Sequence, residues 1–203
     1  MQDKTRMKMF EKGKIYVIMN MIHHYWEEIM YKLNGVMYSA EEIKNKVKEL
    51  ANQIEKDYAG EELLVVGILK GASVFCADLI REINLDVRMD FMVVSSYGTA
   101  TASSGTVKII KDLDVDIENK NVLIVEDIID SGLTLSSLVA ALKTRKPKSL
   151  KLCTLLDKPE RRTSDIKVDY VGYIIEDKFI VGYGIDYAEK YRNLPYIGIV
   201  EDI

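Results

Sequence analysis

The sequence is poor in cysteine and has no long apolar run. Its 203 residues include two cysteines, Cys76 and Cys153, and both lie in apolar stretches, as buried reduced thiols do. We therefore expect a reducing, cytoplasmic location. The apolar segment at residues 15–22 is too short to cross a bilayer, and no small-residue cleavage site follows it. These absences argue against a redox or metal role for the cysteines, a membrane anchor and an export signal.

The sequence also lacks a basic excess and a set of zinc ligands. It has 28 Lys and Arg against 32 Asp and Glu, a net charge of −4. We expect no nucleic-acid partner, because electrostatic binding of phosphates usually needs surplus positive charge. The two histidines, His23 and His24, are adjacent and point in diverging directions on a helix or a strand. With 48% apolar and 30% charged residues, the chain has the composition of a globular protein, and its length of 203 residues predicts one domain with room for a small accessory lobe.

Residues 1–30 are the part of the chain that the sequence explains least. They are rich in Met and mix charged with aromatic residues, without a helical or strand period. We treat them as an N-terminal segment and residues 31–203 as the folded domain. Three alternatives stay open for the segment: an added element, an oligomer contact, or an upstream extension of the reading frame. Mass spectrometry of the native protein distinguishes a start at Met1 from one at Met19, Met21 or Met30.

Strands and helices alternate along the rest of the chain, which predicts an α/β fold. Ser39 and Glu42 have the spacing of a capping box, and apolar residues recur at helical intervals after them. The apolar run Leu63–Leu69 is typical of a strand buried on both faces of a parallel sheet. We expect a mostly parallel twisted sheet with helices on both sides. The predicted helices cover residues 39–59, 72–83 and 131–146, and the predicted strands cover residues 63–69, 87–95, 121–125, 150–156, 170–175 and 179–183.

The stretch with the clearest chemistry begins where an apolar strand ends. Glu126 and Asp127 follow the predicted strand at residues 121–125, and open α/β sheets bind ligands at the carboxyl ends of strands. Residues 130–134 then supply hydroxyls, a glycine and the N–H groups of a helix N-terminus, which suit a phosphate dianion. No Lys-Ser or Lys-Thr pair follows a glycine, so this is not a Walker loop. Carboxylates beside a phosphate cradle point to a ribose phosphate with magnesium; the alternative is that Glu126 and Asp127 cap the next helix.

At these residues the sequence resembles the purine phosphoribosyltransferases, in particular the hypoxanthine-guanine branch of bacterial type. The resemblance runs from about Ser39 to the C-terminus. Residues 125–134 resemble the family's phosphoribosyl pyrophosphate motif, with Leu133 where many relatives have Lys. The family resemblance implies the type I phosphoribosyltransferase fold, with a small hood lobe formed by N- and C-terminal segments. Further segments match in the same order: Leu69-Lys70-Gly71, whose Lys-Gly peptide is often cis in the family, Ser95-Ser96-Tyr97-Gly98, Leu156-Asp157-Lys158, residues 177–187 and residues 191–195.

The resemblance implies an enzyme of purine salvage. It would join a 6-oxopurine, hypoxanthine or guanine, to phosphoribosyl pyrophosphate, giving IMP or GMP and pyrophosphate. It implies Mg²⁺ as cofactor, since this ion prefers oxygen ligands and bridges phosphates, and a homodimer or homotetramer. One alternative is a phosphoribosyltransferase for xanthine or another base. The other is a phosphoribosyl pyrophosphate-sensing regulator that binds nucleic acid, against which the net charge and the retained Asp130 both weigh.

The resemblance also implies roles for residues around the base. Asp130 matches the general base and acid beside purine N7. Lys158 would donate to the exocyclic carbonyl, which predicts oxopurines as substrates and excludes adenine. Phe179 would stack on the base, the backbone of Ile180 would read its ring edge, and Arg192 would grip pyrophosphate. The alternatives are a solvated lysine at 158, core strand residues at 179 and 180, and a solvated charge at 192.

The remaining assignments complete the predicted site. Glu126 and Asp127 would hold the ribose hydroxyls and Mg²⁺, and Asp186 would be the second Mg²⁺ ligand, on the pyrophosphate side. Residues 96–105 have no apolar period and predict a mobile lid, on which Tyr97 would shield the reacting centre from water. The other predicted substrate-binding residues are Lys70, Gly71, Ser96, Ile128, Ser131, Gly132, Leu133 and Thr134.

Overall fold

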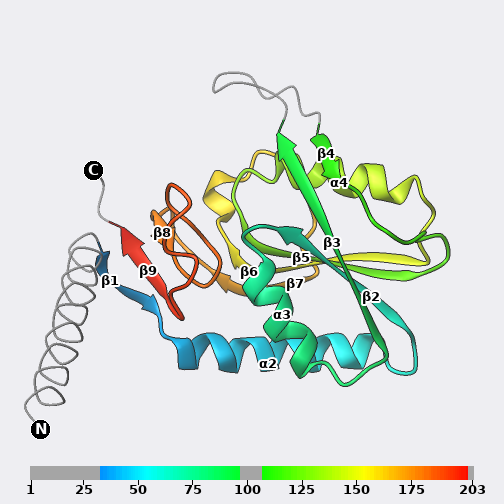
Figure 1. Cartoon of the computed structure of the whole chain (residues 1–203), viewed down its shortest axis with the longest axis horizontal. Coiled ribbons are helices and arrows are strands. Elements are labelled where there is room, and N and C mark those ends of the chain that lie inside the picture. Colours follow the sequence, from blue (N-terminus) through cyan, green and yellow to red (C-terminus); the bar gives the residue numbers. More distant parts are fainter. Residues whose placement is uncertain (1–32, 97–106, 201–203) are drawn as a thin grey trace, which may run out of the picture.

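A computed structural model of the protein describes residues 33–96 and 107–200 (Figure 1). They form a central sheet with helices against it and a smaller sheet at one end. The predictions for residues 1–30, for Tyr97 and for most of the lid lie outside the described residues. The strands are β1 (Leu33–Tyr38), β2 (Leu63–Leu69), β3 (Val87–Ser96), β4 (Val107–Lys111), β5 (Asn121–Ile129), β6 (Ser149–Asp157), β7 (Tyr170–Ile174), β8 (Ile180–Val181) and β9 (Ile197–Val200), and the helices are α2 (Ala40–Asp57), α3 (Ser73–Glu82), α4 (Leu133–Lys143) and the short 3₁₀ helix η1 (Pro159–Arg161).

The central sheet is mostly parallel. Its six strands lie in the order β4-β3-β2-β5-β6-β7, and each neighbouring pair is parallel except β3 with β4. The two strands at its centre, β2 and β5, consist mainly of buried residues. Burial on both faces explains why both strands contain continuous apolar runs instead of an alternating pattern. The predicted fold class is confirmed.

Helices cover both faces of the sheet because successive strand residues point to opposite sides. Leu63 and Val65 of β2 pack in one apolar cluster with α2 and α3, while Leu64 and Val66 pack in a second cluster with α4. Cys76 of α3 lies buried in the first cluster as a free thiol, as predicted, and burial raises its pKa to about 12. The core is therefore two layers divided by the sheet.

The smaller sheet is the hood that the family resemblance implies. Its strands β1, β9 and β8 are antiparallel and come from the two ends of the described chain, which Figure 1 shows side by side. Tyr38 at the end of β1 stacks on Tyr173 of β7, with ring centroids 3.8 Å apart. Beside it α2 starts with the predicted capping box, since Ser39 and Glu42 each accept a bond from the other's backbone N–H. These contacts fix the hood against the edge of the central sheet.

Several predicted boundaries were wrong, and each error has a physical cause. The strand predicted to end at residue 125 continues to Ile129, because Glu126 and Ile128 still pair with β6. The strand predicted at residues 179–183 is only two residues long, because residues 182–184 all have a left-handed φ that turns the chain away. Strands β1, β4 and β9 were missed because all three are short; β1 and β9 pair with each other across the chain, and β4 is an edge strand.

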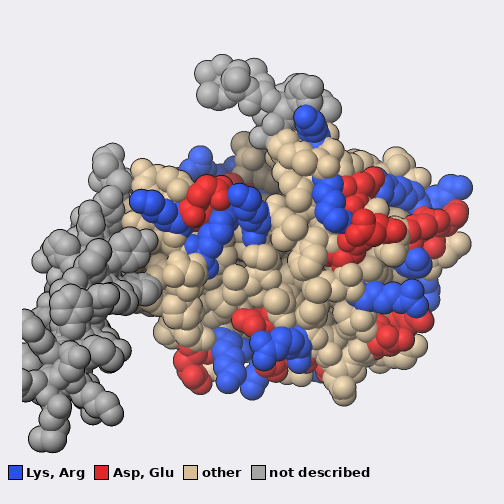
Figure 2. Space-filling view, viewed as in Figure 1, with Lys and Arg blue, Asp and Glu red and all other residues tan. Residues whose placement is uncertain are grey.

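The surface carries charges of both signs. On the face that Figure 2 shows, Lys and Arg side chains lie beside Asp and Glu in several groups, with uncharged surface between the groups. Within the described residues, no helix combines the length and the apolar character that a bilayer crossing requires. The site is therefore best sought in a cavity and not in a broad charged field.

Candidate active site

A cavity of about 500 Å³ opens at the carboxyl ends of β2 and β5. Open α/β sheets bind ligands at this edge, because the loops that follow the strands diverge there and helices begin. Most of the predicted phosphate, ribose and pyrophosphate residues meet in it. Its lining residues are Ile68, Leu69, Lys70, Gly71, Val94, Ser95, residues 126–135, Asp186 and Arg192.

Glu126 and Asp127 form an acidic pair in the floor of this cavity. They lie within β5 and do not cap α4, whose N-cap residue is Gly132 and which has no side-chain cap, so that alternative is wrong. Burial raises the pKa of both carboxyls, and the Asp127 charge together with a hydrogen bond between the two side chains raises the pKa of Glu126 further. A cation bound beside the two carboxyls would offset both the burial and the repulsion between them.

The turn after β2 lies directly against this acidic pair. A Cβ atom on Gly71 would stand 1.9 Å from Oδ2 of Asp127, so no side chain fits at this position. The backbone of Gly71 is similarly close to Gly184, where a Cβ would stand 2.1 Å from the Gly71 carbonyl oxygen. The cis peptide of this turn joins Leu69 to Lys70, one bond before the Lys-Gly peptide that the family resemblance implies. Glycine therefore allows three segments to meet at one point of the cavity wall.

The phosphate cradle forms where β5 turns into α4. Gly132 has a φ of +73°, a left-handed value that favours glycine, and serves as the N-cap of α4. The first N–H groups of a helix have no acceptor within it, and the helix dipole adds partial positive charge at that end. Residues 130–134 all line the cavity, so this helix end can bind an anionic group there. Leu133 in place of Lys leaves these backbone groups unchanged.

Two positively charged side chains, Arg192 and Lys70, are predicted to bind on the pyrophosphate side of the site. Arg192 pairs with Asp186 at 2.7 Å between Nη2 and Oδ1, and its Nη1 donates to the Gly184 carbonyl at 2.8 Å. The Nε of Arg192 is buried and has no hydrogen-bond partner among the described residues. Lys70 pairs with Glu189 at 2.8 Å. A buried N–H without an acceptor is costly, and a bound anion would remove that cost. Arg192 is thus a partly buried group, and the solvated alternative is wrong.

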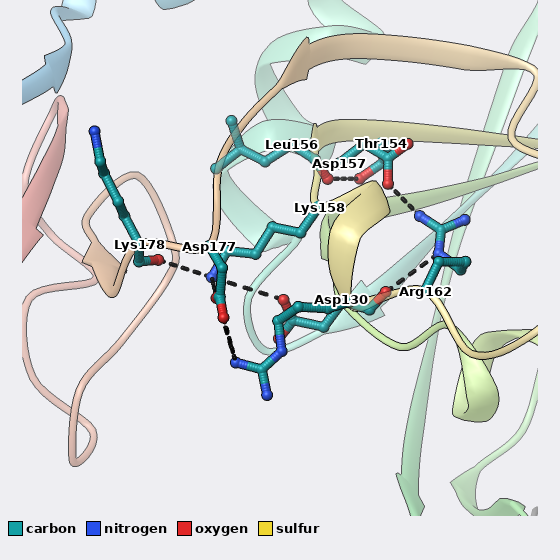
Figure 3. A network of polar contacts seen from close by, with 9 residues as sticks. Asp130, Thr154, Leu156, Asp157, Lys158, Arg162, Asp177 and Lys178 are labelled. Atoms are coloured by element: carbon teal, nitrogen blue, oxygen red, sulfur yellow. Dashed lines mark hydrogen bonds and ion pairs between the residues drawn. The ribbon is translucent and has the colours of Figure 1, made fainter.

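Lys158 is buried at the end of β6, with 6% of its surface exposed. Its ammonium donates to the Lys178 carbonyl at 2.7 Å and lies 3.3 Å from Oδ1 of Asp177, as Figure 3 shows. It also lies 3.7 Å from Oδ1 of Asp130, which lines the cavity. The alternative of a solvated surface lysine is therefore wrong. The Asp130–Lys158 contact joins the cavity to the region where the base is predicted to bind.

Phe179 and Ile180 differ in their surroundings. Phe179 is 47% exposed, and its ring meets Tyr187 edge to face at a centroid distance of 5.3 Å. Ile180 is buried in β8. The core-strand alternative therefore holds for Ile180 and is wrong for Phe179, which is free to stack on a ligand. Neither residue lines the 500 Å³ cavity, and nor does Lys158, so the base region lies beside the phosphate region.

The donor set fits a magnesium ion that takes most of its ligands from substrate and water. Among residues 33–96 and 107–200, no three His, Cys, Asp or Glu side chains are arranged to hold a metal ion. Glu126, Asp127 and Asp186 therefore do not form one three-ligand centre. The buried acidic pair is nevertheless a set of oxygen donors that a cation would stabilise, and Mg²⁺ commonly uses one or two carboxylates with waters and phosphate oxygens. The assignment of these three residues as ligands stays a prediction.

Some charged residues beside the cavity received no role from the sequence. Asp157 is the last residue of an apolar strand, and Glu126 and Asp127 lie near the end of another. An acidic residue at the carboxyl end of an apolar strand is therefore a repeated sequence pattern that could have predicted a role for Asp157. Arg162 and Glu189 give no such signal, because each has one partner that is distant in the sequence: Asp130 for Arg162 and Lys70 for Glu189. Ser96 ends β3, and Tyr97 lies outside the described residues.

Comparison with known proteins decides the family. Residues 37–188 match the model of the phosphoribosyl transferase domain. The chain belongs to the phosphoribosyltransferase family. It is 56% identical over 171 residues to a hypoxanthine-guanine phosphoribosyltransferase from Bacillus subtilis, covering 84% of this chain and 95% of that protein. It is also 53% identical over 175 residues to a bifunctional TilS/HprT protein from Listeria monocytogenes, where the match covers 86% of this chain and 27% of the longer protein.

Solved phosphoribosyltransferase structures agree with the fold. A hypoxanthine-guanine phosphoribosyltransferase from Bacillus anthracis, crystallised with HEPES in its active site, superposes with a TM-score of 0.81 at 58% identity, covering 84% of this chain and all of that one. A hypoxanthine phosphoribosyltransferase from Staphylococcus aureus gives a TM-score of 0.83 at 53% identity, covering 85% of this chain and 94% of that one. The phosphoribosyltransferase match at residues 37–188 contains every residue that lines the cavity except Arg192.

Proposed function

We propose that the protein transfers the phosphoribosyl group of phosphoribosyl pyrophosphate to a 6-oxopurine, hypoxanthine or guanine, in purine salvage. The products are IMP or GMP and pyrophosphate. The observation that carries this proposal is one cavity in which a phosphate cradle, an acidic pair and a partly unsatisfied arginine meet, with a buried lysine 3.7 Å from its edge at Asp130. Relatives at 53–56% identity bear the name hypoxanthine-guanine phosphoribosyltransferase, which is the name for this reaction.

The proposed reaction breaks the bond between ribose C1 and pyrophosphate and forms a bond from C1 to a purine nitrogen. Positive charge develops on the ribosyl group between the two events. The acidic pair, Glu126 and Asp127, lies in a buried part of the cavity, where negative charge stabilises developing positive charge more strongly than in water. Arg192 and Lys70 would take the charge of the departing pyrophosphate, exchanging their present partners Asp186 and Glu189 for phosphate oxygens.

Asp130 would take the proton that the purine loses and return it in the reverse reaction. Its carboxylate lies 3.7 Å from the Lys158 ammonium while Asp130 itself lines the cavity, so it is placed between the ribose side and the base side. Lys158 would donate to the 6-oxo group. An ammonium has donors but no acceptor, so the 6-amino group of adenine would leave it without a partner. Phe179, half exposed, would stack on the base.

Magnesium would be held on the cavity side of Glu126 and Asp127, with Asp186 as a further ligand near pyrophosphate. When bound, the ion would supply positive charge that offsets the charges of the diphosphate and of the acidic pair. The residues around it orient the ribose and the leaving group. We further propose that the protein acts in the cytoplasm as a homodimer or homotetramer without a nucleic-acid partner.

The proposal and its two alternatives differ in which bases are turned over. Steady-state assays with phosphoribosyl pyrophosphate, Mg²⁺ and hypoxanthine, guanine, xanthine, adenine or uracil separate them. We expect turnover of hypoxanthine or guanine and none of adenine. Preferred turnover of xanthine or uracil would support another phosphoribosyltransferase. Binding of phosphoribosyl pyrophosphate without turnover of any base would contradict the enzyme and favour the regulator.

A further inference from the structure

The segment after β6 folds back over the phosphate cradle. The N–H of Lys158 donates to the Ile129 carbonyl at 3.0 Å, and the N–H of Thr163 donates to the Ser131 carbonyl at 3.1 Å. The hydroxyl of Ser164 donates to the same Ser131 carbonyl at 3.0 Å. The cradle therefore has an outer wall, residues 158–164, that touches its backbone and stands outside the cavity lining.

Arg162 is the charged member of this wall and makes two contacts at once (Figure 3). Its Nε donates to the backbone carbonyl of Asp130 at 3.2 Å, and its Nη2 donates to Oδ1 of Asp157, the last residue of β6. The side chains of Arg162 and Asp157 are only 17% and 13% exposed. A guanidinium is planar and delivers donors in fixed directions, so it holds the Asp130 carbonyl at a set distance from the end of β6.

The carboxylate of Asp130, in contrast, is loosely held. Its side chain is 52% exposed, and the nearest cation among the described residues, Lys158, is 3.7 Å away, beyond hydrogen-bond distance. The position of this carboxylate therefore depends on where the backbone of Asp130 is fixed. We propose that Arg162 is a positioning residue that fixes the backbone of Asp130 and so places its carboxylate for proton transfer at the purine.

This proposal rests on the function proposed above, and it assigns different roles to the hydrogen bonds at two adjacent backbone carbonyls. Arg162 donates to the carbonyl of Asp130, the residue whose carboxylate acts on the base. Ser164 donates to the carbonyl of Ser131, which belongs to the phosphate cradle. Misplacement of a reacting group by about 1 Å costs on the order of 100-fold in rate, whereas a distorted cradle weakens phosphate binding. The two side chains should therefore affect different kinetic constants, although they are two residues apart.

The test compares Arg162→Lys with Ser164→Ala. Lysine keeps the charge but has one donor group on a flexible stem, so it cannot hold both partners of Arg162. We expect Arg162→Lys to lower kcat for hypoxanthine by about tenfold or more while the KM for phosphoribosyl pyrophosphate stays within about twofold. Ser164→Ala should instead raise that KM and change kcat less. Equal changes in both constants for Arg162→Lys would overturn the proposal, because they indicate general damage to the loop.

A double-mutant cycle decides whether Arg162 acts through Asp130. We expect the effect of Arg162→Lys on kcat to vanish in the Asp130→Asn background, where no carboxylate is left to position. The same fold reduction in both backgrounds would overturn the inference. If Arg162→Lys does not fold, Asp157→Asn, which weakens the other anchor of the guanidinium, should give a smaller loss of kcat with the same non-additivity. A wild-type protein that turns over no base would instead refute the proposed function and this inference with it.

Discussion

Asp130 and Lys158 are the two residues on which the proposed chemistry at the base depends most. They lie 3.7 Å apart, one at the cavity and one buried behind it. The ammonium of Lys158 is held in place by two acceptors, the Lys178 carbonyl at 2.7 Å and Oδ1 of Asp177 at 3.3 Å. Asp130 would exchange a proton and Lys158 would recognise the 6-oxo group. Variants of the two residues should therefore affect different kinetic constants.

We expect Asp130→Asn to lower kcat by about 10²–10⁴-fold, because a general base contributes on this order and an amide cannot accept the proton. Binding of phosphoribosyl pyrophosphate, measured by calorimetry without purine, should stay mostly intact. Asp165→Asn removes a carboxylate that is exposed and gives a matched control with unchanged kinetics. An equal loss of binding and turnover in Asp130→Asn would mean that Asp130 is structural.

Lys158→Ala should weaken purine binding selectively. We expect the KM for hypoxanthine to rise roughly 10–100-fold, the value of a lost hydrogen bond to a charged donor, with little change in the KM for phosphoribosyl pyrophosphate. Lys167→Ala is the control, since the Lys167 side chain is 87% exposed. An unchanged KM for hypoxanthine in Lys158→Ala would refute its assignment to the base.

At the scale of elements, the site is made by three chain reversals that approach one another closely. The turn after β2 and the turn after β8 meet at Gly71 and Gly184, and Gly71 also lies against Asp127 of β5, a few residues before the β5–α4 junction; these two contacts leave no room for a Cβ atom. Each turn follows a strand that is fixed in a sheet. Strand register therefore determines how phosphate, ribose and pyrophosphate groups are spaced.

Gly71→Ala tests this close approach. The new Cβ would stand 1.9 Å from Oδ2 of Asp127, so the turn or the acidic pair must move. We expect kcat/KM for phosphoribosyl pyrophosphate to fall by about 100-fold or more, because small displacements of positioning groups carry such costs. Gly198→Ala in β9 is the matched control: its Cβ meets first the flexible end of Leu33, at 3.3 Å, so activity should persist. Full activity of Gly71→Ala would contradict the proposed role of the turn.

At the scale of the whole molecule, the features that could be predicted from the sequence are those determined by residues close together in the chain. The buried runs of β2 and β5, the capping box at Ser39 and the glycine at the start of α4 all express local rules, and all are confirmed. The hood was predicted only through the family resemblance. Local patterns did not reveal it, because β1 and β9 are short and pair across almost the whole chain. The contact of Arg162 with Asp130 spans 32 residues and gave no local signal.

The proposed phosphoribosyl transfer to hypoxanthine is tested most directly by product stoichiometry. The protein is incubated with phosphoribosyl pyrophosphate, Mg²⁺ and hypoxanthine, and IMP and pyrophosphate are quantified together by chromatography. We expect IMP and pyrophosphate to appear in equal amounts, and no AMP to form when adenine replaces hypoxanthine. Pyrophosphate release without IMP, or AMP formed as readily as IMP, would contradict the proposed transfer.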